Sequence, residues 1–190
     1  MLTATYSIVT LSTEQNKTRR LLHRLQQHIR NAWNGLKSID LASIESTLNN
    51  LTQFDKFCRS RKVEVHLIPA IRRVTPAADA LLAELEALSA SGMNILRSLR
   101  EQLGHAFEDG VVRVSEVCNS MELYCNKLQR RLAKEEEELF PLARRMFSIE
   151  EWFAIAEKFL SDDAQVRGSR ENFPSHAMQA PAQSRRMAAL

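Results

Sequence analysis

The sequence predicts an all-α fold, an up-down-up-down four-helix bundle followed by a short C-terminal helix and a mobile tail. Only five Gly and five Pro occur in the 190 residues, too few for a strand-rich fold with many tight turns. Apolar residues recur every three or four positions along four long segments, which is the pattern of amphipathic helices. Short connections between such helices make consecutive helices antiparallel neighbours.

The first two helices follow from their capping residues and from one proline. The first helix should begin at residues 12–13, where Ser or Thr can cap it, and should end near Gly35. The second should begin near Ser38 and run to Pro69, where proline bends or ends a helix. Residues 1–10 are interpreted as a short arm packed on the bundle.

The third helix has a clear start, because Thr75 can cap it and Pro76 suits its first position. Its apolar pattern continues until Gly110. The fourth helix carries apolar residues from Val114 onward and meets Pro141 near its end.

The last part of the chain divides into a helix and a tail. A short helix is expected over residues 148–160, with aromatic residues on its packing face. After it the composition shifts to Asp, Gln, Ser, Pro and Arg without periodicity. The predicted domains are a bundle over residues 1–162 and a flexible tail over 163–190.

Bulk properties exclude several classes of protein. A net charge of +3 is too small to indicate a nucleic-acid partner. Cys58, Cys118 and Cys125 show no CxxC spacing and cannot all pair, so we interpret them as free thiols in a reducing cytoplasm. No apolar run reaches the ~18–20 residues of a membrane span, and the N-terminus lacks a signal-peptide pattern.

An internal repeat connects the ends of the second and fourth helices. Residues 59–73 and 131–145 are identical at seven of fifteen aligned positions. Two helical hairpins of common ancestry explain the repeat; chance similarity between two Arg/Glu-rich helix ends is the alternative. The identical pairs include Arg59/Arg131, Lys62/Lys134, Glu64/Glu136, Leu67/Leu139 and Pro69/Pro141.

The second copy of the repeat carries a family resemblance. The run EEEELFPLA at residues 135–143, with Tyr124 before it and Glu150-Glu151-Trp152 after it, closes the fourth predicted helix and opens the short last one. This pattern resembles the end of hemerythrin-like (HHE cation-binding) proteins, and the resemblance extends over residues 10–165. It implies a four-helix bundle whose core holds two oxygen-bridged irons.

The resemblance also implies a set of iron ligands: one His on helix one, one on helix three, and His-x-x-x-Glu on helices two and four. Residues i and i+4 share one helix face, so each such pair points together into the core. Of the corresponding positions here, only the last keeps a metal-binding side chain. These positions are Gln15, Arg59 (or Ser60), Val63, Ser89, Arg131 and Glu135.

Arginine at two ligand positions predicts that the metal site is degenerate, with no cofactor. A guanidinium group stays protonated and has no lone pair to give a cation. We expect Arg59 and Arg131 to approach across the bundle and neutralise Glu64, Glu135 or Glu136; the alternative is that both arginines extend to solvent. For an altered di-iron site, the fallback ligands are Glu64, Glu136 and His66.

The sequence therefore favours a non-enzymatic regulatory or interaction module of the bacterial hemerythrin-like kind, with an unknown protein partner. The alternative is an iron protein that handles oxygen, nitric oxide or iron through an altered ligand set. A third class, binding nucleic acid or a membrane surface through the basic side of helix one, is less favoured. We expect the apolar face of the last helix, which carries Trp152 and Phe153, to cap the bundle; self-association through this face is the alternative.

Overall fold

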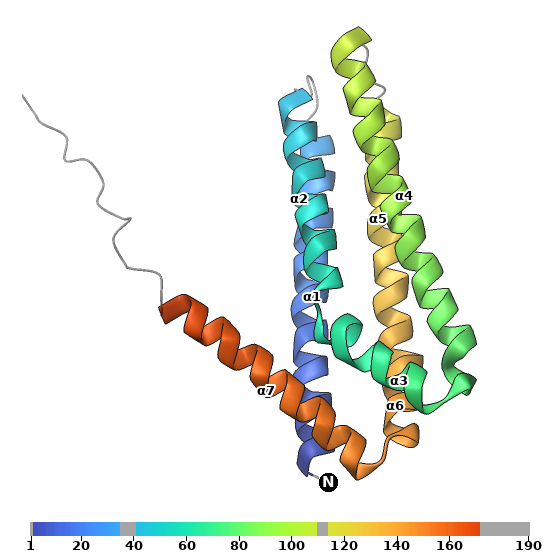
Figure 1. Ribbon diagram of the computed structural model, residues 1–190. Helices are drawn as coiled ribbons and strands as arrows, with labels where there is room; N and C mark the ends of the chain where they lie inside the picture. The colour runs from blue at the N-terminus through green and yellow to red at the C-terminus, as the bar shows by residue number, and fades with distance from the viewer. Residues whose placement is uncertain (1, 35–40, 110–113, 172–190) are drawn as a thin grey trace, which may run out of the picture.

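The computed structural model describes residues 2–34, 41–109 and 114–171 (Figure 1). Every regular element in these ranges is helical, and they contain no strand, so the all-α prediction is confirmed. In the same ranges, no helix combines the length and the apolar character needed to cross a bilayer.

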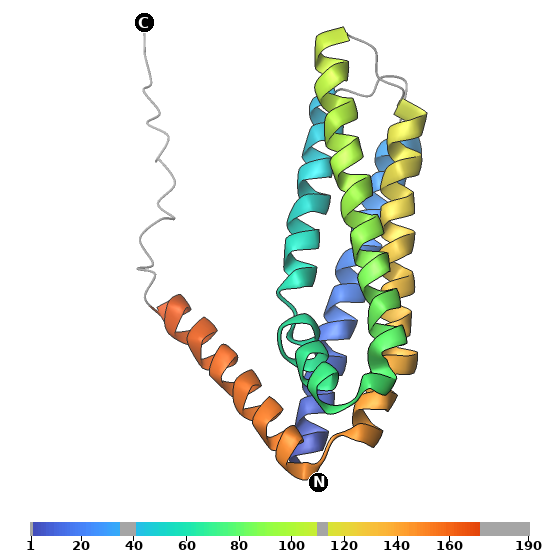
Figure 2. The same cartoon turned by 45° about the vertical axis from the view of Figure 1, so that its right-hand side comes forward.

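The long helices are α1 (Leu2–Asn34), α2 (Leu41–Arg59), α4 (Asp79–Asp109) and α5 (Val114–Lys134). They lie side by side in Figures 1 and 2, with α1 and α4 ascending from the end near the N-terminus and α2 and α5 descending toward it. The packing is most extensive between α4 and α5. Helix α1 packs on α5, and α2 packs on α4.

One helix begins earlier in the chain, and another ends later, than the sequence indicates. Helix α1 begins at Leu2 rather than at residues 12–13, because Ala4, Ile8 and Leu11 pack in an apolar cluster shared with the last helix. That last helix, α7 (Ile149–Glu171), passes its expected end at residue 160. The first part of the predicted tail, residues 163–171, is therefore helical, and the rest of the tail lies outside the described residues.

The second predicted helix is interrupted earlier than expected. Helix α2 ends at Arg59, ten residues before the proline that was expected to break it. A tight turn follows, in which the Ser60 amide donates to the Phe57 carbonyl at 3.1 Å. The chain resumes as a π-helical turn, η1 (Val63–Leu67), which leads into α3 (Ile68–Val74).

The internal repeat has a structural counterpart. In the second copy, α5 leads into the π-helical turn η3 (Glu135–Leu139) and then into α6 (Phe140–Met146), at the positions equivalent to η1 and α3. Each π turn directly precedes an X-Pro pair. Proline clashes with the carbonyl four residues back in an α-helix, and the wider π turn relieves this clash. The two halves of the chain thus share a local structure as well as a sequence pattern.

The predicted restart at Thr75 is confirmed. Its hydroxyl oxygen accepts a hydrogen bond from the Ala77 amide at 3.2 Å, which caps the short 3-10 helix η2 (Pro76–Ala78) before α4 begins.

The core consists of two apolar clusters separated by a polar layer. One cluster, which we call the lower cluster, lies at the end of the molecule near the N-terminus. It joins η1, α3, α6 and α7 with the first turns of α1 and α4. The upper cluster joins α2 with the remaining parts of α1, α4 and α5. Between them lie buried polar and charged side chains: Gln15, Thr18, Arg61, Arg131 and Glu135. This layer is the candidate site.

Candidate functional site

The centre of the polar layer is an ion pair between Arg61 and Glu135, whose side chains are both fully buried. Arg61 lies in the turn between α2 and η1, and Glu135 begins η3. The Arg61 Nη1 donates to Glu135 Oε2 at 2.8 Å, and Nη2 donates to Oε1 at 2.7 Å. This bidentate geometry is the strong form of an arginine–carboxylate pair.

The remaining donors of Arg61 bind two other parts of the chain. Its Nε donates to the carbonyl of Cys58 at 3.1 Å, and Nη1 also donates to the Gln15 side-chain oxygen at 2.9 Å. Gln15 in turn donates through Nε2 to the Leu132 carbonyl at 2.7 Å. Arg61 therefore connects α1, the end of α2 and the end of α5.

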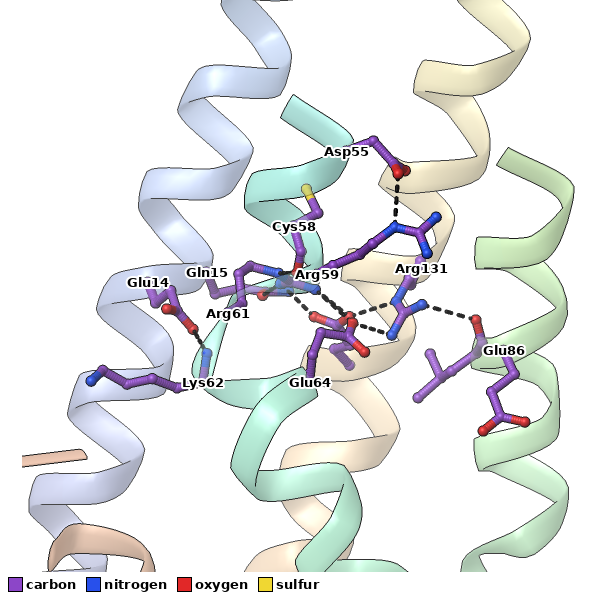
Figure 3. Close-up of polar contacts among 12 residues, drawn as sticks. Glu14, Gln15, Asp55, Cys58, Arg59, Arg61, Lys62, Glu64, Glu86 and Arg131 are labelled. Atoms are coloured by element: carbon purple, nitrogen blue, oxygen red, sulfur yellow. Dashed lines mark hydrogen bonds and ion pairs between the residues drawn. The ribbon is translucent and has the colours of Figure 1, made fainter. Parts of the chain in front are cut away.

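Arg131 forms the second half of the layer (Figure 3). Its Nε donates to Glu135 Oε1 at 3.0 Å, and its Nη1 donates to the Leu85 carbonyl on α4 at 3.2 Å. Its Nη2 donates to the Glu64 carboxylate on η1. We refer to Gln15, Arg61, Glu64, Arg131 and Glu135 as the ion network.

The ion network is electrically balanced, with two guanidinium groups and two carboxylates. Although burial alone would lower the pKa of Arg61, the Glu135 carboxylate raises it above its ordinary value. Arg61 therefore stays charged. Forming such a pair adds little net stability, because both ions lose their hydration water. Removing one partner is costly, because the other charge stays buried without a partner. A large loss of stability on removing one partner therefore does not make the intact network a large net source of stability.

Glu64 is the least well compensated member of the ion network. Burial raises the pKa of its carboxyl above the ordinary 4.5, more than Arg131 lowers it, and Glu135 raises it further. A carboxyl with a raised folded-state pKa binds its proton more readily in the folded chain, so its contribution to stability grows as the pH falls toward 4.5.

We therefore expect Glu64→Gln to flatten the pH dependence of unfolding. Because glutamine does not titrate, the variant should lose the part of the pH dependence that Glu64 supplies, so the natural chain should gain stability relative to the variant as the pH falls through the raised pKa. Urea unfolding between neutral pH and mildly acidic pH measures this difference, with Glu136→Gln as the exposed control. Parallel pH curves for the natural chain and Glu64→Gln would contradict the assignment.

The structure brings together three of the positions implied by the family resemblance. Gln15, Arg131 and Glu135 all belong to the ion network. Val63 is buried in the lower apolar cluster and contributes no polar group. Ser89 is half-buried on α4 and lines a pocket next to Arg131.

The expectation for Arg59 is wrong, whereas that for Arg131 is confirmed. Arg59 is about half exposed and pairs with Asp55 one helical turn back, at 2.9 Å; Figure 3 shows it directed to Asp55. Arg61 takes the central place instead. Because α2 ends at Arg59, the turn that follows redirects the chain, and Arg61 rather than Arg59 enters the core. The sequence pattern predicts one continuous helix from Ser38 to Pro69, so it does not indicate that Arg61 enters the core.

The three fallback ligands point to different neighbours. Glu64 pairs with Arg131 in the ion network. His66 Nε2 lies 2.6 Å from Asp162 Oδ2 on α7. Glu136 is exposed and accepts from an arginine of α1 at 2.5 Å. Across residues 2–34, 41–109 and 114–171, no three His, Cys, Asp or Glu side chains are grouped so that they could hold a metal ion.

His23, His28 and the basic side of α1 lie at the surface. His23 and His28 are exposed, and His176 lies outside the described residues. On the basic side, Arg19 pairs with Glu136 and Arg30 with Glu122. These pairs neutralise part of the charge that a nucleic acid would contact.

The three cysteines differ in burial, and this predicts their reactivity. Burial raises the pKa of Cys58 and of Cys125 to about 12, and that of the half-exposed Cys118 to about 11. Only the thiolate attacks disulfide reagents. We expect Cys118 to react first with a thiol-specific reagent in the folded chain, and the buried pair only on unfolding. Mass spectrometry of partly labelled protein checks this order; faster labelling of Cys58 would contradict it.

No family model, no curated protein and no solved structure matches the chain.

Proposed function

We propose that the chain is a divergent hemerythrin-like, up-down-up-down four-helix bundle that acts as a non-enzymatic regulatory or interaction module in the cytoplasm. In this proposal the ion network takes the place of the family's two-iron centre. The observation that carries it is the Arg61 guanidinium, which lies in the core among Gln15, Arg131 and Glu135. Those three residues occupy positions where the resemblance would require iron ligands.

The residues present do not fit a two-iron centre. Both oxygens of Glu135 accept hydrogen bonds from arginine, so neither is free to bind a cation. The two guanidinium groups repel positive charge and cannot act as ligands. The Gln15 oxygen is likewise engaged by Arg61. An iron atom at this place would have to displace a buried, fully bonded arginine.

The proposal is tested by the iron content of the full chain purified from an iron-supplemented culture. We expect far less than one iron per chain and no absorbance from an oxo-bridged pair. Two irons per chain with that absorbance would overturn the proposal and favour the iron-handling alternative. The iron content of the Arg61→His variant is a second measurement, because this substitution removes one of the two guanidinium groups and leaves Arg131 in place.

A candidate surface for interaction lies where α1 and α7 pack side by side. Phe153 and Leu160 on α7 are 61% and 57% exposed, and Val9 on α1 is 57% exposed. Phe153 and Leu160 line an apolar groove together with Tyr6, whereas Trp152 is buried and packs edge-on against the neighbouring aromatic ring. Exposed apolar patches of this kind mark sites of protein contact.

Charge indicates which partner fits this groove. Residues 2–13 of α1 carry no charged side chain, while the groove lining on α7 carries a negative charge at Glu157. We therefore propose an amphipathic helix with basic flanks as the occupant. Figures 1 and 2 show α7 diverging from the other helices toward its C-terminal end.

A synthetic amphipathic peptide of leucine and lysine is the probe for this groove. Fluorescence anisotropy should show binding to the natural chain, about tenfold weaker binding to Phe153→Asp, and unchanged binding to Leu123→Asp, a control exposed on α5. Equal binding to both variants would contradict the assignment. A dimer in sedimentation that Phe153→Asp converts to monomer would show that a second copy is the occupant instead.

A further inference from the structure

A pocket of about 300 Å³ lies beside the ion network, enclosed by α2, α4, α5 and the start of α3. Its volume is at the lower end of the range for small-molecule sites. Most of its wall is apolar, formed by Ile68, Leu88, Gly92, Met93, Tyr124 and Leu128. This pocket is separate from the α1/α7 groove.

The wall between α4 and α5 is held in a fixed shape. Gly92 is buried, and a Cβ added to it would lie 3.4 Å from two ring carbons of Tyr124, so the ring lies directly against the α4 backbone. The Tyr124 hydroxyl donates to Asp55 at 3.2 Å, which orients the ring. Met93 at the pocket is 39% exposed, although a methionine side chain gains by burial. The pocket therefore offers a preformed apolar surface to a ligand.

The charged side chains that line the pocket are paired, with one exception. Arg59 pairs with Asp55, and Arg131 pairs with Glu64. The remaining acid of the lining, Glu86, pairs with an arginine of α3. Lys127 is half-buried on α5 and has no ion-pair partner within the described part of the chain. The pocket thus carries one uncompensated positive charge.

We infer that this pocket binds a small apolar carboxylate, with its hydrocarbon part against the Tyr124 wall and its carboxylate paired with Lys127. A neutral molecule would leave the lysine without a partner, and an amine would add a second positive charge beside it. The size of the pocket limits the ligand to a medium-chain aliphatic acid or a single-ring aromatic acid. This inference goes beyond the proposed function, because it assigns a ligand to a site that the partner helix does not touch.

Calorimetric titration of the full chain with octanoate is the first test. We expect saturable binding of octanoate and at least tenfold weaker binding of octylamine. Lys127→Ala should weaken octanoate binding by about tenfold, whereas Lys56→Ala, an exposed lysine on α2 outside the pocket, should not change it. Absence of saturable octanoate binding, or equal affinity in Lys127→Ala and the natural chain, would overturn the inference.

The place of binding is tested independently of affinity. In amide NMR spectra, octanoate should shift the resonances of Ser89 and Gly92 on α4, which border the pocket, and leave that of Ala154 on α7 unchanged. Shifts confined to α1 and α7 would place the ligand in the other groove and contradict the assignment. Because this readout needs no substitution, it does not depend on whether a variant folds.

Discussion

Replacing Arg61 by alanine is expected to lower the free energy of unfolding by about 3–5 kcal/mol, the cost of breaking a buried ion pair from one side. The variant leaves Glu135 fully buried with one arginine instead of two. It also removes the partner of the Gln15 oxygen and the side-chain donor of the Cys58 carbonyl, which keeps the backbone amide of residue 61. A loss of this size is a large share of the total stability of a domain.

Chemical denaturation of the natural chain and the variant measures this loss. Arg30→Ala is the matched control, because Arg30 also pairs with a glutamate, but on the surface, where its side chain is 63% exposed. The control should lose at most about 1 kcal/mol. If Arg61→Ala lowered the free energy of unfolding as little as Arg30→Ala does, Arg61 would not lie where the structure places it.

Replacing Arg131 by alanine is expected to have an effect of similar size, about 3–5 kcal/mol. Arg131 pairs with both carboxylates of the ion network, as Arg61 does, and it also donates to the carbonyl of Leu85. Without it, Glu64 and Glu135 would face each other with only Arg61 between them. Thermal unfolding followed by circular dichroism measures the change.

The internal repeat supplies the control for this variant. Arg59 occupies the equivalent position in the first copy, but it is about half exposed and pairs with Asp55 at the surface. Arg59→Ala should therefore cost at most about 1 kcal/mol. Equal melting temperatures for Arg59→Ala and Arg131→Ala would contradict the asymmetry between the two halves.

The repeat explains how far the sequence predicts the site. The identities between residues 59–73 and 131–145 indicate two similar helix ends, and both contain a π turn before proline. The contact of Arg131 with Glu64 and Glu135 is expected from the family resemblance, which puts Arg131 and Glu135 at core-facing positions where charged residues need partners. Helical class and the restart at Thr75 were equally predictable from local signals.

The place of Arg61 could not be predicted in this way. Nothing between Cys58 and Val63 is a glycine or a proline, so no residue there marks the end of α2. The turn is stabilised by the tertiary contacts of Arg61 itself, which reach Gln15 and Glu135 on other helices. Such contacts are distant in sequence and leave no periodic signal.

The ends of α1 and α7 were missed for a related reason. Residues 2–13 include four Thr and two Ser, which have lower helix propensity than Ala or Leu, so the pattern alone favours an irregular arm. In the structure these residues are helical because they pack on α7. Helix α7 is in turn held by Lys62, whose Nζ lies 2.9 Å from Asp163, and by His66. Packing between two segments decides both boundaries.

A double-mutant cycle on Arg61 and Glu135 is the most direct measurement of whether these two side chains form the paired centre of the core. Arg61→Met and Glu135→Leu should each destabilise the chain, while the double variant, which leaves no stranded charge, should be more stable than the sum of the two losses by about 2 kcal/mol or more. Losses that add to within about 0.5 kcal/mol would mean that the two groups do not interact, and the account of the core would be wrong.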